Sequence, residues 1–264
     1  MPELLTSVID IASLAAERIL EVYKTDFAVQ DKADKSPLTA ADMAAHNTIC
    51  AGLADLTPAI PILSEESASI PYETRRQWRQ YWLVDPLDGT REFIKRNGEF
   101  TVNIALIKEH RPILGVVYAP VTKHCYFATT GQGAYKQTPG NSADRIQSKT
   151  TSADNFIIAG SRSHATAQQA RFIESLGKNI KLVTIGSSLK ICLVAEGKID
   201  IYPRFGPTSE WDTAAAHCIV DEAGGMLTDT TLKPLSYNRK ESLLNPDFLV
   251  IADQKFNWEK YLRI

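Results

Sequence analysis

The chain has 264 residues, with 29 basic and 31 acidic side chains and a formal net charge of −2. This near-neutral balance argues against a nucleic-acid-binding protein, which needs a basic face to displace counterions. Hydrophobic residues make up 44% of the chain, which is too many for a disordered protein and enough for one or two folded domains.

The sequence shows no signal for a membrane or for export. No window reaches the roughly 20 apolar residues of a membrane span, and Met1-Pro2-Glu3-Leu4 lacks the basic start of a signal peptide. The cysteines are widely spaced without a CxxC pair, which favours free thiols in a reducing compartment. They are Cys50, Cys125, Cys192 and Cys218. These features predict a cytoplasmic protein.

Two amphipathic helices are predicted at the N-terminal end. Apolar residues at three- and four-residue spacing predict a helix over residues 3–23. Thr39 is predicted to begin a second helix that runs to about Leu56, with Asp42 three residues later completing a capping box. Capping alone would explain an acidic residue at position 42.

Strands dominate the next segment. Tyr81–Val84 is a short apolar run that ends at Asp85, and three longer runs follow at Phe100–Ile107, Ile113–Tyr118 and Cys125–Ala128. Because the connections between these three runs are short, they predict an antiparallel meander.

Residues 137–264 show a different pattern, in which strands and helices alternate. The polar stretch 137–152 is the expected junction, so we predict domains at 1–136 and 137–264. The predicted strands are 156–159, 181–185, 199–202 and 248–252, and the predicted helices are 165–176, 188–196 and 212–223. A cleft between two such halves is a common place for a small-molecule site.

Two carboxylates follow the apolar run at Tyr81–Val84. Asp85 and Asp88 lie three residues apart in Asp85-Pro86-Leu87-Asp88-Gly89-Thr90, a turn that can direct both side chains and the Leu87 carbonyl at one point. Mg²⁺ prefers oxygen ligands, so this turn is a candidate metal site. Asp and Gly also build ordinary turns, and that alternative would suffice for this segment alone.

Further acidic residues occupy similar positions. Glu65 and Glu66 end an apolar run at 61–64, and Asp212 begins a predicted helix. Each is individually explicable, as part of a solvated loop or as a residue favoured at a helix start. Together they favour a metal site more strongly than any one of them does.

Two long segments resemble the signatures of the inositol monophosphatase superfamily of metal-dependent, lithium-sensitive phosphatases. The first is Trp82-Leu83-Val84-Asp85-Pro86-Leu87-Asp88-Gly89-Thr90. The second is Trp211-Asp212-Thr213-Ala214-Ala215, followed by Glu222-Ala223-Gly224-Gly225. Both are complete and lie at the expected distance from each other.

The resemblance is closer still to one branch, the bacterial CysQ-type 3′(2′),5′-bisphosphate nucleotidases. It is carried by Tyr81–Ile107, Pro112–Val121 and Gly186–Asp212. It covers nearly the whole chain and is weakest at 67–77 and 137–155.

The resemblance implies a fold and a set of roles. The fold is a two-domain layered α-β-α-β-α sandwich of mixed α/β (α+β) class, of the inositol monophosphatase and fructose bisphosphatase type. The implied cofactor is Mg²⁺, as two or three ions. The implied metal ligands are Glu65, Asp85, the carbonyl of Leu87, Asp88 and Asp212. Asp42 and Thr90 are implied to form a hydrogen-bonded catalytic pair that orients or deprotonates the attacking water.

The implied substrate is adenosine 3′,5′-bisphosphate, a by-product of sulfate assimilation, hydrolysed to AMP and phosphate. The implied substrate-binding residues are Gly89, Thr90, Arg162, Ser187, Lys190, Arg204 and Asp212. Ser187 and Lys190 are three residues apart, so one helical turn would place a hydroxyl and an ammonium on the same face. Arg162 is explained equally well as a surface residue. We expect a small-molecule partner and no nucleic acid polymer.

Two alternative functions stay open. An inositol or sugar phosphatase would share every metal ligand, and Lys190 and Arg204 would discriminate it from a nucleotidase. A non-catalytic nucleotide sensor would be expected to have lost one of the acidic residues, and none is lost. Peripheral association with the cytoplasmic face of the inner membrane is described for some bacterial relatives, but no basic amphipathic helix here requires it. The sequence leaves open the number of metals at turnover, the oligomeric state and the choice between 3′- and 2′-phosphate.

Overall fold

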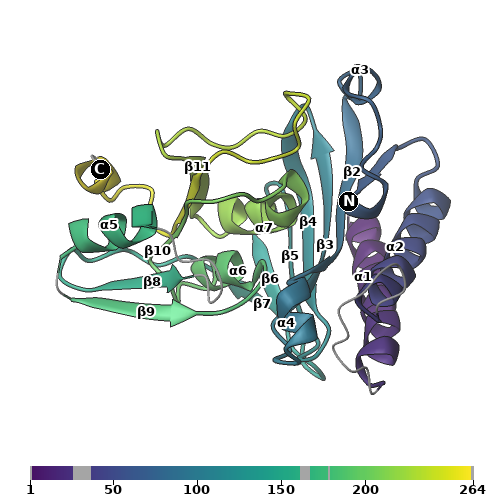
Figure 1. Ribbon diagram of the computed structural model, residues 1–264, viewed down its shortest axis with the longest axis horizontal. Helices are drawn as coiled ribbons and strands as arrows, with labels where there is room; N and C mark the ends of the chain where they lie inside the picture. Colours follow the sequence, from purple (N-terminus) through teal and green to yellow (C-terminus); the bar gives the residue numbers. More distant parts are fainter. Residues whose placement is uncertain (1, 26–36, 161–166, 178, 263–264) are drawn as a thin grey trace.

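The chain folds into five layers in which helices and sheets alternate (Figure 1). The computed structural model describes residues 2–25, 37–160, 167–177 and 179–262. From one side to the other, the layers are a helix pair, a seven-stranded sheet, a second helix pair, a five-stranded sheet and a helical cover. This order confirms the predicted α-β-α-β-α fold class.

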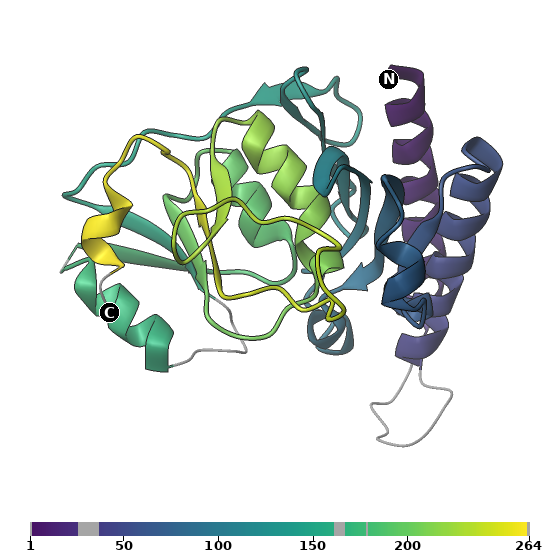
Figure 2. The ribbon, with the colours of Figure 1, turned by 90° about the horizontal axis from the view of Figure 1, so that it is seen from above.

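The first layer consists of α1 (Pro2–Tyr23) and α2 (Pro37–Leu56), which lie side by side along one face of the molecule (Figure 2). α2 begins at Pro37, two residues earlier than predicted. Proline suits a first helical position, because its fixed φ is already helical and its missing N–H would have no partner there. Thr39 therefore lies inside the helix, and the capping box predicted for Thr39 and Asp42 is wrong.

The first sheet has seven strands in sequence order. They are β1 (Ile62–Ser64), β2 (Gln80–Asp88), β3 (Thr101–Lys108), β4 (Arg111–Ala119), β5 (His124–Thr129), β6 (Ala134–Gln137) and β7 (Asp144–Ile146). β1 runs parallel to β2, and all later neighbours are antiparallel, which confirms the meander. The sheet continues through β7, past the domain division predicted at residue 136, which stays a prediction.

The second sheet has the strand order β11-β12-β10-β8-β9. Its strands are β8 (Phe156–Gly160), β9 (Ile180–Thr184), β10 (Ile201–Arg204), β11 (Met226–Asp229) and β12 (Phe248–Ile251). α6 (Leu189–Ala195) and α7 (Glu210–Glu222) lie between the two sheets, and α5 (Ala167–Ser175) and the short helix Trp258–Tyr261 cover the outer face (Figure 1). The alternating pattern of the second half is therefore confirmed, although β11 was not predicted.

Burial on both faces explains why β2 reads as a continuous apolar run. Trp82 and Val84 pack toward α1 and α2, whereas Tyr81 and Leu83 pack toward the inner helices. Successive side chains of a strand point to opposite faces, so a sheet covered on both sides needs apolar residues at every position. A third core, around Phe172, joins the second sheet to its helical cover.

The end of β2 differs from the prediction in a way that matters for the site. The strand does not stop at Val84 but runs to Asp88, with an irregularity in its pairing to β3 between Asp85 and Asp88. A bulge of this kind bends a strand and changes the direction of its side chains, and such bulges are common beside active sites. None of the described helices is long and apolar enough to cross a bilayer.

We predict that Gly115→Ala destabilises the fold. A Cβ at Gly115 in β4 would lie 2.1 Å from the Ala215 carbonyl oxygen and 3.0 Å from the Cβ of Cys218, both in α7. Because backbone atoms of a packed helix cannot move aside, the free energy of unfolding should fall by about 3 kcal/mol. Urea denaturation followed by circular dichroism measures it.

The matched control is Gly160→Ala in β8. There a new Cβ would meet Leu182 Cδ1 at 2.9 Å, and that side chain is 52% exposed, so it can rotate away. The expected loss is under about 1 kcal/mol. Equal losses in the two variants would contradict the backbone explanation.

Candidate active site

The carboxyl ends of β1 and β2 bring two acidic residues together. In this parallel pair Ser64 lies opposite Val84, so the residues that follow, Glu65 and Asp85, are neighbours, although β1 ends at Ser64 and β2 continues to Asp88. Burial raises the pKa of Glu65, and the neighbouring Asp85 opposes that rise. Asp85 Oδ1 also accepts the N–H of Leu87 at 3.0 Å, which fixes the turn toward Asp88.

Asp88 connects the two halves of the chain through Ser188. Its Oδ2 lies 2.6 Å from both the backbone nitrogen and the Oγ of Ser188, which donate to it. The same Oγ lies 2.8 Å from the carbonyl oxygen of Asp212, and Asn103 Nδ2 donates to it at 2.9 Å. Ser188 therefore fixes the distance between the end of β2 and the start of α7.

Asp212 occupies the first turn of α7 and completes a capping box there. Its Oδ2 accepts the N–H of Ser209 at 2.9 Å, while the Ser209 side chain caps the helix in return. The structural explanation considered for this residue is thus correct. It leaves Oδ1 free for another role, because no hydrogen bond within the described chain uses that atom.

Like charges dominate the electrostatics of this cluster. Burial raises the pKa of Asp42 to about 7, with Glu66 and Glu65 adding to the effect. Burial also raises the pKa of Asp212 to about 7, and Asp88 is the next contributor. The pKa of Asp85, which is 1% exposed, is raised well above its usual value by burial and then by Asp88.

This charge distribution fits a bound cation. In the described ranges, no ion pair neutralises Asp42, Glu65, Asp85, Asp88 or Asp212. Carboxylate oxygens are the ligands that Mg²⁺ prefers, and a cation would remove the mutual repulsion. Among the described residues, no three His, Cys, Asp or Glu side chains are grouped closely enough to hold a metal ion by themselves. Mg²⁺ usually keeps waters and substrate oxygens in its shell, so an open arrangement is compatible with it.

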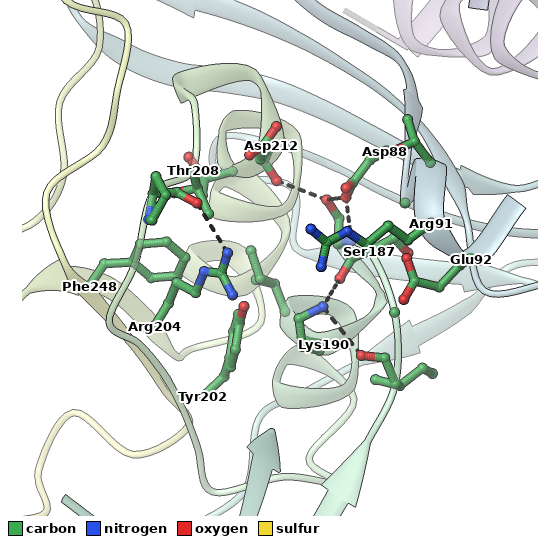
Figure 3. A pocket seen from close by; sticks show the side chains of 18 residues that line it. Asp88, Arg91, Glu92, Ser187, Lys190, Tyr202, Arg204, Thr208, Asp212 and Phe248 are labelled. Carbon is green, nitrogen blue, oxygen red and sulfur yellow. Dashed lines mark hydrogen bonds between the residues drawn. The ribbon is translucent and has the colours of Figure 1, made fainter. Parts of the chain in front are cut away.

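A cavity of about 300 Å³ adjoins the acidic cluster (Figure 3). It collects most of the predicted substrate-binding residues, namely Gly89, Thr90, Ser187, Lys190, Arg204 and Asp212, together with the metal-ligand candidate Asp88. Arg162 lies outside the described residues. Asp42 and Thr90 are both described, and no hydrogen bond joins them, so their predicted pairing is absent in this structure and their catalytic role stays a prediction.

Lys190 supplies a buried positive charge to this cavity. Its ammonium donates to the carbonyl oxygens of Ser187 at 2.7 Å and Ile185 at 3.3 Å, and it lies 5.4 Å from the centre of the Tyr202 ring. Burial lowers its pKa to about 8, against the opposing effect of Asp88. Ser187 adopts φ 50°, a left-handed conformation that is uncommon outside glycine and often occurs at functional sites.

Arg204 is the last residue of β10 and lies on the other side of the cavity. Its Nη2 donates to the Pro207 carbonyl at 3.0 Å, and its buried Nε has no partner in the described structure. The aromatic rings of Tyr202 and Phe248 meet edge to face beside it, 5.8 Å apart. Arg204, Tyr202 and Phe248 therefore form an aromatic wall that combines a cation with apolar surface. Such a wall suits a ligand in which a planar ring is joined to an anionic group.

The sequence interpretation missed several residues of the site. Ser188 was not proposed as a site residue, although it is adjacent to Ser187. Its hydroxyl contacts Asp88, Asn103 and the carbonyl of Asp212. Arg91 and Glu92 also line the cavity, and only their position next to Thr90 could have indicated them. Tyr202, Thr208 and Phe248 also line the cavity and were not predicted.

Comparison with known proteins identifies the family. Residues 1–262 match the model of the inositol monophosphatase family. The 3′(2′),5′-bisphosphate nucleotidase CysQ of Escherichia coli K12 is 51% identical over 249 residues, which is 94% of this chain and 99% of that protein. The protein of the same name from Haemophilus influenzae is 38% identical over 263 residues, covering 97% of this chain and 95% of that one. The chain belongs to the inositol monophosphatase family, as its two signature segments predicted.

Solved structures agree with this assignment. The crystal structure of CysQ from Bacteroides thetaiotaomicron, a bacterial member of the inositol monophosphatase family, has 46% identity and a TM-score of 0.86, covering 95% of this chain and 97% of that one. An inositol monophosphatase from Zymomonas mobilis has a TM-score of 0.82 at 22% identity, covering 98% of this chain and 97% of that one. At that identity the likeness concerns the fold alone.

We predict that Ser188→Ala weakens the connection between the halves. The change removes the hydroxyl that lies between Asp88 and Asp212 and leaves the Asn103 amide with only a long 3.5 Å contact to Asp88, so unfolding should become easier by about 2 kcal/mol. Thermal denaturation monitored by near-ultraviolet circular dichroism checks it. Ser187→Ala, whose Oγ makes one long contact of 3.5 Å, is the control and should lose under about 0.5 kcal/mol. Equal stability of the two variants would contradict the assignment.

Proposed function

We propose that the chain is a Mg²⁺-dependent phosphomonoesterase that hydrolyses adenosine 3′,5′-bisphosphate to AMP and phosphate. The observation that carries this proposal is the cavity itself, which has uncompensated carboxylates at one end and Lys190 and Arg204 farther in. A phosphate ester with a second anionic group matches such a charge distribution. The name shared by the CysQ relatives, 3′(2′),5′-bisphosphate nucleotidase, supports the same substrate class.

The residues proposed to hold Mg²⁺ are Glu65, Asp85, the carbonyl of Leu87, Asp88 and Asp212. Two or three ions are proposed, and the family generally depends on this metal. When bound, the metal supplies positive charge and Lewis acidity at the reacting phosphate. Asp88 and Asp212 each use one oxygen to accept protein hydrogen bonds, which orients the other.

Asp42 is proposed to take the proton from the attacking water. It lies in α2 beside the acidic cluster and is 9% exposed, so its carboxylate is largely removed from bulk water. Thr90, at the start of α4 (Thr90–Ile94), is proposed to orient that water with its hydroxyl. The backbone N–H groups of Gly89 and Thr90 are proposed to bind the phosphate oxygens.

Substrate recognition is assigned to the second half of the chain. Lys190 and Ser187 are proposed to bind the phosphate that is not hydrolysed, and Arg204 with the neighbouring aromatic rings is proposed to bind the nucleoside. Arg162 is retained as a further candidate from the sequence. The proposed place of action is the cytoplasm, where the free thiols of the four cysteines would stay reduced.

Two alternatives make different predictions. An inositol or sugar phosphatase would use the same acidic cluster but would need neither Lys190 nor Arg204. A nucleotide sensor would bind without turnover, and the complete acidic cluster disfavours it because buried like charges destabilise a fold that has no use for them.

The first test compares three esters with purified protein and Mg²⁺. We expect kcat/KM for adenosine 3′,5′-bisphosphate to exceed that for inositol 1-phosphate and fructose 1,6-bisphosphate by about a hundredfold, or about 2.7 kcal/mol. EDTA should abolish phosphate release, and Li⁺ should inhibit it. A preference for another ester would reject the nucleotide assignment, and binding without hydrolysis would favour the sensor.

The second test uses the pH dependence of substrate binding. The pKa of Lys190 is lowered to about 8, so its ammonium is present below that pH and is lost as the pH rises through it. We expect KM for the bisphosphate to rise about tenfold per pH unit above 8, because an anion binds the charged form. Lys190→Met should have a high KM that no longer changes over this range. A wild-type KM that is flat from pH 7 to 9.5 would contradict the role of Lys190.

A further inference from the structure

Glu92 is a buried carboxylate in the cavity that has no role in the chemistry described so far. It lies in α4, two residues after Thr90, is 8% exposed, and points into the cavity (Figure 3). Its side-chain oxygens accept no hydrogen bond and form no ion pair with any residue that the structure describes. An unpartnered carboxylate at this depth has acceptor capacity available for a ligand.

The position of this side chain is fixed by the glycine that it packs against. A Cβ at Gly186 would lie 2.5 Å from Glu92 Cγ and 3.1 Å from its Cδ, so only glycine allows the close approach. Glu99 holds the same loop from the other side, because its Oε2 accepts the Gly186 N–H at 2.9 Å. The Glu92 side chain therefore packs closely against Gly186, which limits the positions that its carboxylate can take.

Charge balance alone does not explain Glu92. The negative charge of Glu92 acts to raise the pKa of Lys190, but the two side chains form no ion pair. The Lys190 ammonium already donates to the Ser187 and Ile185 carbonyls. A carboxylate in a cavity that takes phosphates weakens anion binding unless the ligand gives it a hydrogen bond. The ligand must therefore bring a hydroxyl or an amine to this point.

The place of Glu92 in the cavity distinguishes between these two donors. Glu92 and Arg91 lie on the Asp88 side, whereas Tyr202, Arg204 and Phe248 lie on the opposite side (Figure 3). With the reacting phosphate beside Asp88 and Thr90, as proposed above, the ribose carbon that carries it would lie on the Glu92 side and the base amine would lie toward the aromatic wall. On a ribose 3′-phosphate the donor next to that carbon is the 2′-hydroxyl.

We propose that Glu92 accepts a hydrogen bond from the ribose hydroxyl adjacent to the scissile phosphate, and so selects ribonucleotides over deoxyribonucleotides. This inference rests on the proposed function and deepens it. With a ribonucleotide, the Glu92 carboxylate gains the 2′-hydroxyl as a hydrogen-bond donor. With a deoxyribonucleotide, it faces the phosphate and an apolar CH₂ group and has no donor. Selectivity therefore comes both from a hydrogen bond that favours the ribonucleotide and from an unpaired carboxylate that disfavours the deoxyribonucleotide.

The test is a substrate-by-variant cycle. We would measure kcat/KM for adenosine 3′,5′-bisphosphate and its 2′-deoxy analogue with the wild type, Glu92→Ala and Glu92→Gln. The ribo-to-deoxy ratio should fall about tenfold in Glu92→Ala, or about 1.4 kcal/mol. It should fall less in Glu92→Gln, whose amide oxygen still accepts. Comparing ratios between variants cancels any difference in intrinsic reactivity of the two esters.

The controls separate this role from a structural one. Glu109→Ala, a surface carboxylate whose side chain is 55% exposed, should leave the ratio unchanged. Turnover of the deoxy analogue by Glu92→Ala should equal or exceed that of the wild type, which also reports that the variant is folded. An unchanged ratio in Glu92→Ala and Glu92→Gln overturns the inference while the proposed function stands. A wild type that hydrolyses neither nucleotide overturns both.

Discussion

The mutual repulsion of carboxylates at the end of β2 is the constraint on which the rest of the site depends. Asp85 is almost completely buried, with Asp88, Glu65, Asp212 and Asp42 close enough to act on its charge. Their arrangement stores unfavourable energy that a hard cation can release, and the surrounding fold must be rigid enough to hold it. The sheet supplies that rigidity, because β2 is paired on both edges and packed on both faces.

The connection between the halves depends on the same carboxylates. Asp88 uses one oxygen to hold Ser188, and Asp212 uses one to cap α7, so each residue both builds the fold and faces the cavity. A cleft between two independently packed halves would vary in width. Here the inner helices share one core with the first sheet, and the Ser188 contacts add a polar connection at the site itself.

Much of this arrangement could be predicted from the sequence, and the failures have physical causes. The helices, the meander and the alternating second half follow from periodicity. Four of the five metal-ligand candidates lie in two long signature segments, and Glu65 lies outside both. The end of β2 was placed too early because Asp and Pro are typical turn residues, whereas here they lie in a bulge that remains paired to β3. Ser188 and Glu92 were missed because their importance comes from contacts with residues about a hundred positions away in the chain. The roles of Asp42 and Thr90 came from the resemblance, and the structure shows no hydrogen bond between them.

The distribution of partners around Lys190 shows how the cavity keeps a usable positive charge next to so many carboxylates. Its ammonium is solvated by two carbonyl oxygens, which are neutral dipoles, instead of by Asp88 or Glu92. An ion pair with either would have cancelled the charge that an anionic ligand needs. Both carbonyls belong to the loop at Ser187, which has a left-handed backbone conformation. The conformation of this loop therefore determines whether the Lys190 charge is available to a ligand. The acidic residues are restrained in the same manner, by N–H and hydroxyl donors and not by cations. Opposite charges thus stay unpaired within one cavity, where the proposed metal and phosphate ester would pair with them.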